Sequence, residues 1–326
     1  MISYKAAFYE RSGHGESVLQ MGAFEKVEPA KGEVCVCMEY SGVNPSDTKI
    51  RAGLRGDLPF PKIIPHSDGS GIIQSIGHGV SLSVGQRVWI YNAGFQRPFG
   101  TAGEFCTLPE TLCVPLQDHM SFEEGACLGI PAITAAACLL SLDVKKKDTI
   151  IITGGAGSVG LASIQLAKFL GLKTIVIVSS PEKATAAQNA GADLTLNYKK
   201  EPILDRILEA TQNQGANGMI DVDFGGNIDW SVQALCDHAV IATYASNHNS
   251  PFPFYMFMFK TITLKPIFVY TLTTDMRTKA INLLNKAIAA KAFKPIIASV
   301  YPLEDIAQTH KIVEKGNKIG QILLKI

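Results

Sequence analysis

The sequence predicts an α/β protein in which a doubly wound parallel sheet is joined to a β-rich domain that is partly barrel-shaped. From residue 126 to residue 270, apolar strands alternate with helices of about 10–15 residues, the pattern of βαβ units around a parallel sheet. Before residue 126, short strand-like runs are separated by recurring glycines and prolines, which is typical of a compact β-rich domain.

The expected domain boundaries follow this change of pattern. The β-rich domain takes residues 1–125 together with the tail 271–326, and the parallel sheet takes residues 126–270. We expect the last strand, 321–326, to rejoin the first domain. The main elements expected after residue 126 are strands 149–153, 174–178, 219–223, 239–243 and 261–269, and helices 126–142, 158–170, 182–190, 202–211, 228–235 and 276–292.

Composition disfavours several classes of function. Thirty basic and 29 acidic residues leave a net charge of +1 with no basic stripe, so nucleic acid is not an expected partner. The seven cysteines are odd in number and scattered, which indicates a reducing compartment rather than a disulfide framework. The N-terminus lacks the basic start and apolar run of a signal peptide, and we expect a cytoplasmic location.

One apolar stretch, 126–142, needs separate consideration as a membrane span. Gly129 and Pro131 interrupt it, and it falls short of the roughly 20 apolar residues that a spanning helix needs. A buried helix is therefore the better interpretation, and no membrane insertion is expected.

A glycine-rich segment carries the strongest ligand prediction. It matches G-x-G-x-x-G and lies between an apolar strand and an amphipathic helix, which is the context of a Rossmann-type dinucleotide site. Its glycines permit a tight turn, close approach of the pyrophosphate and close helix packing, while the helix N-terminus binds the phosphates. An ordinary glycine-rich turn is the alternative. The residues expected to contact the cofactor are Gly155, Ala156, Gly157, Ser158, Val159 and Gly160.

The second strand of the sheet indicates which dinucleotide binds. An NAD enzyme usually has an acidic residue near its tip to bind the ribose 2′-hydroxyl. Here Ser179 and Ser180 stand at the tip, and Lys183 follows one turn later. Hydroxyls and an ammonium group suit a 2′-phosphate, so we predict NADPH. Ser180 also fits the N-cap of a helix that begins at Pro181, and both roles can hold together. Tyr198, after the next strand, could close the adenine ribose pocket.

Five further segments, together with the glycine loop, resemble the medium-chain dehydrogenase/reductase superfamily. Within it they are similar to the zinc-free, zeta-crystallin-like NADPH:quinone oxidoreductases. The resemblance covers nearly the whole chain and is specific only when the segments are taken together. It implies a Rossmann domain, a GroES-like catalytic domain and hydride transfer from NADPH to a quinone. The segments are 42–47, 64–71, 88–93, 97–102 and 122–131.

The same comparison predicts that this chain binds no metal. Zinc-dependent members carry a catalytic cysteine where this chain has Asn44, and a ligand histidine where it has Ser67. A closely spaced four-cysteine lobe is also absent. Catalytic zinc needs three protein ligands, and without this Lewis acid the oxidation of an alcohol is disfavoured. Hydride transfer to an acceptor that is already electrophilic remains feasible.

The resemblance also implies residues around the nicotinamide. It places Asn44 beside the ring, although Asn44 also fits an N-cap before Pro45. Solvent or Tyr91 is the candidate proton donor, and Lys49 stands where many members have a tyrosine. Because the carboxyl ends of parallel strands bind ligands, Gly226, Tyr244 and Ser246 are expected at the cofactor. The resemblance adds Thr134, Phe268, Val269, Tyr270 and Lys318.

Three functional hypotheses therefore stand at this point. The first is an NADPH-dependent quinone reductase. The second is an NADPH-dependent reductase of activated C=C bonds in enals, enones or enoyl thioesters. The third is a non-catalytic NADPH-binding protein with a structural or sensing role. Stretch 251–270, rich in Phe, Tyr and Met, could form a quinone-binding wall, but core packing with a dimer contact is favoured, and a homodimer is expected.

Overall fold

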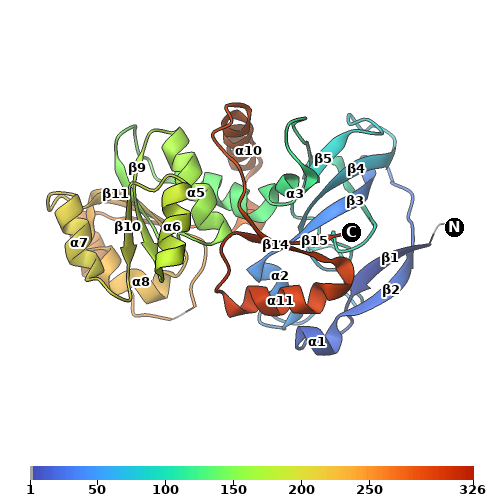
Figure 1. Ribbon diagram of the computed structural model, residues 1–326, viewed down its shortest axis with the longest axis horizontal. Helices are drawn as coiled ribbons and strands as arrows, with labels where there is room; N and C mark the ends of the chain where they lie inside the picture. The colour runs from blue at the N-terminus through green and yellow to red at the C-terminus, as the bar shows by residue number, and fades with distance from the viewer. Residues whose placement is uncertain (1–2, 248) are drawn as a thin grey trace. The chain divides into compact units, whose positions relative to one another are not determined.

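The computed structural model describes residues 3–247 and 249–326, which divide into two compact units (Figure 1). The first unit combines the described residues up to Pro131 with the tail Pro295–Ile326, and the second is Ala132–Lys294. The predicted fold class is confirmed, because one unit holds a parallel sheet and the other a separate β-rich sheet. The structure assigns residues 271–294 to the second unit rather than to the first.

A six-stranded parallel sheet forms the centre of the second unit. Its order across the sheet is β10 (Leu194–Asn197), β9 (Lys173–Val178), β8 (Thr149–Ile152), β11 (Ala216–Asp221), β12 (Leu235–Thr243) and β13 (Thr263–Pro266). The chain starts at β8, runs outward to β10, and then crosses to β11 on the other side of β8. This is the doubly wound order in which dinucleotides bind where the direction reverses, at the carboxyl edge between β8 and β11.

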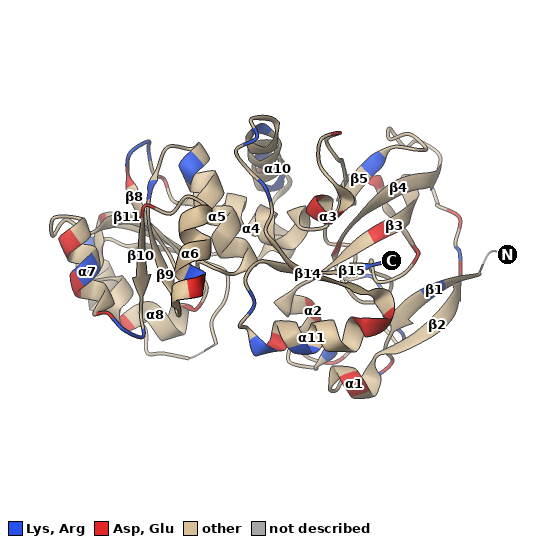
Figure 2. Cartoon of the chain, viewed as in Figure 1, with Lys and Arg blue, Asp and Glu red and all other residues tan. Residues whose placement is uncertain are grey.

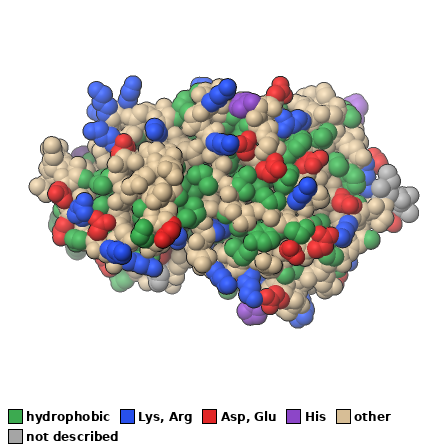
Figure 3. Space-filling model, viewed as in Figure 1, with side chains coloured by type: hydrophobic (Ala, Val, Ile, Leu, Met, Phe, Trp, Pro, Cys, Tyr) green, Lys and Arg blue, Asp and Glu red, His purple; other side chains and the backbone are tan. Residues whose placement is uncertain are grey.

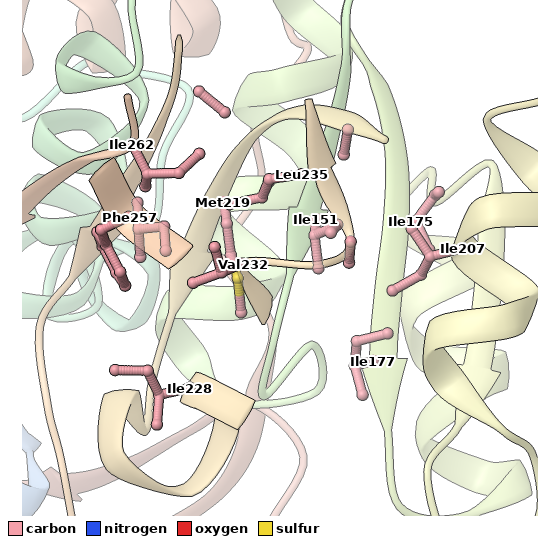
Figure 4. Close-up of a cluster of buried hydrophobic side chains, with 14 of the residues drawn as sticks. Ile151, Ile175, Ile177, Ile207, Met219, Ile228, Val232, Leu235, Phe257 and Ile262 are labelled. Carbon is pink, nitrogen blue, oxygen red and sulfur yellow. The ribbon is translucent and has the colours of Figure 1, made fainter. Parts of the chain in front are cut away.

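Helices cover both faces of this sheet. Figure 4 shows one face, where Ile151, Ile177 and Met219 of the strands form a single buried cluster with Ile207, Ile228 and Phe257 of the helices. Alternate strand residues point to the opposite face, where α5 packs with α4 and α10. The helices of this unit are α4 (Ile133–Ser141), α5 (Ser158–Phe169), α6 (Pro181–Asn189), α7 (Ile203–Ala210), α8 (Phe224–Ser231), α9 (Phe254–Lys260) and α10 (Thr274–Ala289), with the 3-10 turn Val269–Thr271.

Three elements differ from the sequence-based expectation. The apolar stretch 126–142 is not one helix, because Gly129 has non-helical dihedral angles and Pro131 lies inside the following turn. The expected helix 228–235 begins earlier, as α8, and the expected strand 261–269 shortens to β13 with α9 before it. Because α10 packs on α4 and α5, it belongs with the parallel sheet and not with the tail.

The first unit is built on a mixed seven-stranded sheet with the order β14-β15-β3-β4-β5-β7, in which β6 also pairs with β3. Strand β15, from the C-terminal tail, pairs antiparallel with the end of β3, with Ile322 opposite Val43. The strands are β3 (Glu33–Val43), β4 (Asp68–Ile76), β5 (Arg87–Ile90), β6 (Phe105–Pro109), β7 (Cys113–Pro115), β14 (Ile297–Pro302) and β15 (Gln321–Lys325), beside the separate hairpin of β1 (Ser3–Phe8) and β2 (Gln20–Glu25).

The remaining elements of the first unit are short. They are the helices α1 (Gly15–Val18), α2 (Pro45–Arg51), α3 (Phe122–Gly125) and α11 (Ile306–Lys315), the 3-10 turns Glu110–Leu112 and Leu303–Asp305, and the π turn Leu128–Ala132, which reaches the boundary between the units. Basic and acidic side chains are interspersed on both units (Figures 2 and 3), in keeping with the small net charge. Among the described residues, no helix is long and apolar enough to cross a membrane.

Candidate functional site

The glycine loop follows β8 and leads into α5. A Cβ at Gly155 would lie 2.0 Å from Cγ1 of Val176 on β9, and one at Gly160 would lie 2.4 Å from the carbonyl oxygen of Gly154. A Cβ at Gly157 would meet one atom, the carbonyl oxygen of Gly154 at 3.3 Å, which is a tight contact but a milder one than at the other two glycines. Helix α5 begins after Gly157, and no described side chain caps it. The first-turn N–H groups of an α-helix find no carbonyl partner in the helix itself, and this end of the helix dipole favours negative charge, so the start of α5 suits an anion.

The tip of β9 brings together the residues expected to select the dinucleotide. The ammonium group of Lys183 donates to the hydroxyl of Ser179 at 3.1 Å. The hydroxyl of Ser180 accepts from the backbone N–H of Lys183 at 3.3 Å, so Ser180 is the N-cap of α6. A hydrogen bond to Ser180 lowers the pKa of the exposed Glu182 carboxyl. The tip thus carries the ammonium group of Lys183 and the hydroxyls of Ser179 and Ser180. One acid, Glu182, is the second residue of α6.

A buried carboxylate that the sequence analysis missed joins the ends of β8 and β11. Asp221 accepts from the hydroxyl of Thr153 and from the side-chain amide of Asn227, both at 2.7 Å. The hydroxyl of Thr153 in turn accepts from the N–H of Val222 at 2.9 Å. Burial raises the pKa of Asp221. These bonds hold the residue before the glycine loop against the neighbouring strand, and an acid at the end of a buried strand was the signal available in sequence.

Other predicted residues of the second unit follow strands at the same carboxyl edge. The N–H of Tyr244 donates to the carbonyl of Asp221 at 3.2 Å, and burial raises the pKa of Tyr244 well above its ordinary value. Ser246 accepts from the N–H of Gly225 at 3.0 Å, next to Gly226 in the first turn of α8. Tyr198 is exposed after β10.

The remaining predicted residues of this unit lie on other elements. Phe268 is exposed just after β13. Val269 and Tyr270 are buried in the 3-10 turn that follows, and Thr134 is buried in the first turn of α4.

In the first unit, the side chain of Asn44 is held at both ends of its amide. Its Nδ2 donates to Oδ2 of Asp68 at 2.7 Å, and its Oδ1 accepts from Nε2 of Gln321 at 3.2 Å. The Asn44 N–H donates to Asp47 at 2.8 Å, and Pro45 is the first residue of α2. Asn44 therefore occupies the N-cap position, as its sequence context predicts, while its side chain is turned toward Asp68 and Gln321.

The carboxyl group of Asp68 accepts its other hydrogen bonds from the backbone just after Gly129, where the apolar stretch 126–142 departs from helical geometry. The N–H of Ile130 donates to both carboxyl oxygens at 2.9 Å. A Cβ at Gly129 would lie 2.1 Å from Oδ1 of Asp68, so the break exists where this carboxyl group enters. Burial, and then the nearby Asp47, raise the pKa of Asp68, and burial raises the pKa of Asp47 to about 7. Sequence reasoning assigned no role to Asp68 or Gln321.

The two positions that the sequence resemblance aligns with zinc ligands are both buried in this structure. The side chain of Asn44 is bonded to Asp68, whereas Ser67 is buried and its backbone carbonyl accepts from the N–H of Ala93 at 3.0 Å. Across the described ranges, no group of three or more His, Cys, Asp or Glu side chains lies close enough to hold a metal.

Three further predicted residues lie in the first unit. The hydroxyl of Tyr91 donates to the carbonyl of Thr111 at 2.6 Å, which uses its only proton. Lys49 is half-buried in the last turn of α2. The ammonium group of Lys318 donates to the carbonyl of Gly320, and burial lowers the pKa of Lys318 to about 8.

Each of the two units contains a segment that matches a known protein family. Residues 30–118 match the alcohol dehydrogenase GroES-like domain, and residues 158–286 match the zinc-binding dehydrogenase family. The expected pairing of a GroES-like domain with a Rossmann domain is thereby confirmed.

Similar proteins extend the likeness over almost the whole chain. A protein named quinone oxidoreductase from Rattus norvegicus is 30% identical over 300 residues, covering 91% of this chain and 90% of that protein. A mycobacterial protein solved in complex with NADPH has a TM-score of 0.88 at 27% identity, covering 99% of this chain and 100% of that one. Quinone oxidoreductase from Escherichia coli, also solved with NADPH, has a TM-score of 0.86 at 26% identity, with the same coverage.

Proposed function

This chain belongs to the medium-chain dehydrogenase/reductase superfamily, within its quinone oxidoreductase type, and from that membership we propose that it is a cytoplasmic, zinc-independent NADPH:quinone reductase. The observation that carries the proposal is the neutral amide of Asn44, tied to Asp68 and Gln321 where a zinc enzyme needs a thiolate ligand. Such a site offers no Lewis acid for an alcohol but suits an acceptor that is already electrophilic.

The second unit binds and orients the cofactor in this proposal. The first-turn amides of α5 receive the pyrophosphate, and Ser179 with Lys183 receives the 2′-phosphate. Bound NADPH supplies the hydride. The further contacts that we propose come from Ser180, Tyr198, Gly226, Tyr244, Ser246, Thr134 and the 268–270 turn.

From the first unit, the residues that we propose as further cofactor contacts are Asn44, Lys49 and Lys318. A quinone that gains a hydride becomes a hydroquinone monoanion and takes up one proton. The hydroxyl proton of Tyr91 is already bonded to Thr111, which supports solvent as the proton source.

We expect the purified protein to oxidise NADPH faster with quinones than with enals or enones. The measurement is NADPH consumption with a matched panel of both acceptor classes, each run with NADH as well. Faster turnover with enones would support the reduction of activated C=C bonds instead. Tight NADPH binding without turnover on any acceptor would support the structural or sensing role.

We also propose a homodimer formed through the edge of the parallel sheet. Strand β13 ends the sheet, and in α9, which directly precedes it in the chain, Phe254, Tyr255 and Phe259 are 59%, 67% and 75% exposed. Exposed aromatic clusters of this kind mark protein interfaces.

The double variant Tyr255→Glu, Phe259→Glu is expected to sediment as a monomer, because it places charge in the contact. Leu54→Glu, at another highly exposed apolar position, should leave the dimer intact. An unchanged sedimentation coefficient for the α9 variant would refute this interface.

A further inference from the structure

Within the first unit, a single file of buried, hydrogen-bonded polar side chains leads from His310 to Asp68. Nε2 of His310, on α11, lies 2.9 Å from Nε2 of His66. Nδ1 of His66 lies 2.9 Å from the hydroxyl of Ser41, which lies 2.8 Å from the hydroxyl of Thr101. Thr101 then bonds to the carbonyl oxygen of Asp68 at 2.6 Å. All four side chains are almost fully buried, so water does not compete for these bonds.

The end of the file at Asp68 sets the direction of every bond. A carbonyl oxygen only accepts, so Thr101 spends its one proton on Asp68. Ser41 must therefore donate to Thr101, and its own single proton is then used. The contact between Ser41 and His66 consequently requires a hydrogen on Nδ1 of His66.

The histidine pair follows from the same count of protons. Burial lowers the pKa of His66 to about 3 and the pKa of His310 well below its ordinary value, so both imidazoles are neutral. With Nδ1 protonated, Nε2 of His66 is bare and accepts from Nε2–H of His310. The ring centroids lie 5.2 Å apart at an interplanar angle of 23°, which matches rings meeting end to end around a 2.9 Å N···N bond rather than stacking.

This assignment leaves Nδ1 of His310 as an unprotonated acceptor, and that buried atom has no partner among the described residues. After burial and the neighbouring His66, the buried guanidinium of Arg51 also lowers the pKa of His310 and so disfavours an imidazolium here. Arg51 itself is paired with Glu314 of α11.

We propose that the file from His310 to Thr101 positions Asn44 through Asp68, with His66 in its Nδ1–H form and His310 in its Nε2–H form. The hydrogen bonds of the file fix two things: the backbone conformation of His66 and the orientation of Asp68. His66 has a φ of 77°, a left-handed conformation that is costly for a residue with a side chain. Two residues on, Asp68 is bonded at its backbone to Thr101 and at its carboxyl group to Asn44. His66 and His310 are thus positioning residues, and their effect on turnover rests on the function proposed above.

The tautomers can be tested without any activity. Imidazole nitrogen chemical shifts of the full-length protein should show protonated Nδ1 with bare Nε2 for His66, and the reverse for His310. A scalar coupling between the two Nε2 atoms should report the bond between the rings. A proton on Nε2 of His66, or a charged ring, would overturn the assignment.

The positioning role is tested by two matched pairs of variants. Glutamine at 310 can place an N–H donor where Nε2 lies, whereas leucine cannot, so His310→Leu should shift the side-chain amide signal of Asn44 and His310→Gln should not. Thr101→Val, which removes the donor to Asp68, should shift the same signal, and Thr101→Ser should not. The second pair keeps the test decisive if His310→Leu fails to fold.

Turnover provides the last readout. For both disruptive variants we expect kcat to fall about tenfold or more at an unchanged KM for NADPH, because small misplacements of an orienting group cost this much. The positioning role would be overturned if neither the side-chain amide signal of Asn44 nor kcat changed in any folded variant. If the wild-type protein reduces no acceptor, the function proposed above fails, while the shifts of the Asn44 amide still decide the inference.

Discussion

Replacing Gly160 by alanine is expected to lower both the stability of the protein and its affinity for NADPH. The new Cβ would lie 2.4 Å from the carbonyl oxygen of Gly154 and 2.8 Å from Cα of Gly155. Both are backbone atoms that cannot rotate away, so α5 must move off the loop, at a cost of about 1–3 kcal/mol. The same movement carries the first-turn amides out of register with the pyrophosphate. Thermal unfolding and a fluorescence titration with NADPH measure the two effects.

Gly157→Ala provides the matched control in the same loop. Its Cβ would meet only the carbonyl oxygen of Gly154, at 3.3 Å, so the unfolding temperature is expected to fall less than in Gly160→Ala. The methyl group would nevertheless stand where the backbone approaches the pyrophosphate, so NADPH should bind more weakly. Equal loss of stability in the two variants would contradict the separate roles assigned to these glycines.

Removing the polar pair at the tip of β9 should change the choice of dinucleotide. In the double variant Ser179→Ala, Lys183→Ala, the 2′-phosphate loses an ammonium group and a hydroxyl that the protein orders in advance. Hydrogen bonds to charged groups contribute about 1.5–3 kcal/mol, which corresponds to a rise of about 10- to 100-fold in the KM for NADPH. The KM for NADH, which lacks this phosphate, should stay nearly constant.

Steady-state kinetics with both cofactors decide this prediction. Lys173→Ala removes an exposed lysine at the opposite end of the same strand, so it controls for the loss of charge alone. Equal efficiency of the wild-type protein with NADH and NADPH, or parallel losses with both in the double variant, would show that the tip does not read the 2′-phosphate. Glu182, two residues after Ser180, would then be the residue to examine as a partner of the ribose.

Local patterns account for the parts of the molecule that could be predicted. The parallel sheet and its helices repeat with regular periods, so their order could be predicted and the fold class proved right. Helix α9 was missed because its aromatic residues are also typical of strands, and because much of its apolar surface is exposed rather than placed on one buried face. The break at Gly129 and Pro131 was visible in sequence, but its purpose, to offer the N–H of Ile130 to Asp68, was not.

By itself, the sequence determined the strand, glycine loop and helix of the proposed nucleotide site, the hydroxyls and lysine that follow the next strand, and the family to which the chain belongs. These features lie within a few residues of one another, where spacing and residue type carry the information. Only the tertiary structure revealed what surrounds Asn44. Gln321 reaches it across 277 residues, and His66 meets His310 across 244. Hydrogen bonds between such distant parts of a chain leave no periodic trace, because only the folded sheet and α11 bring their donors and acceptors together.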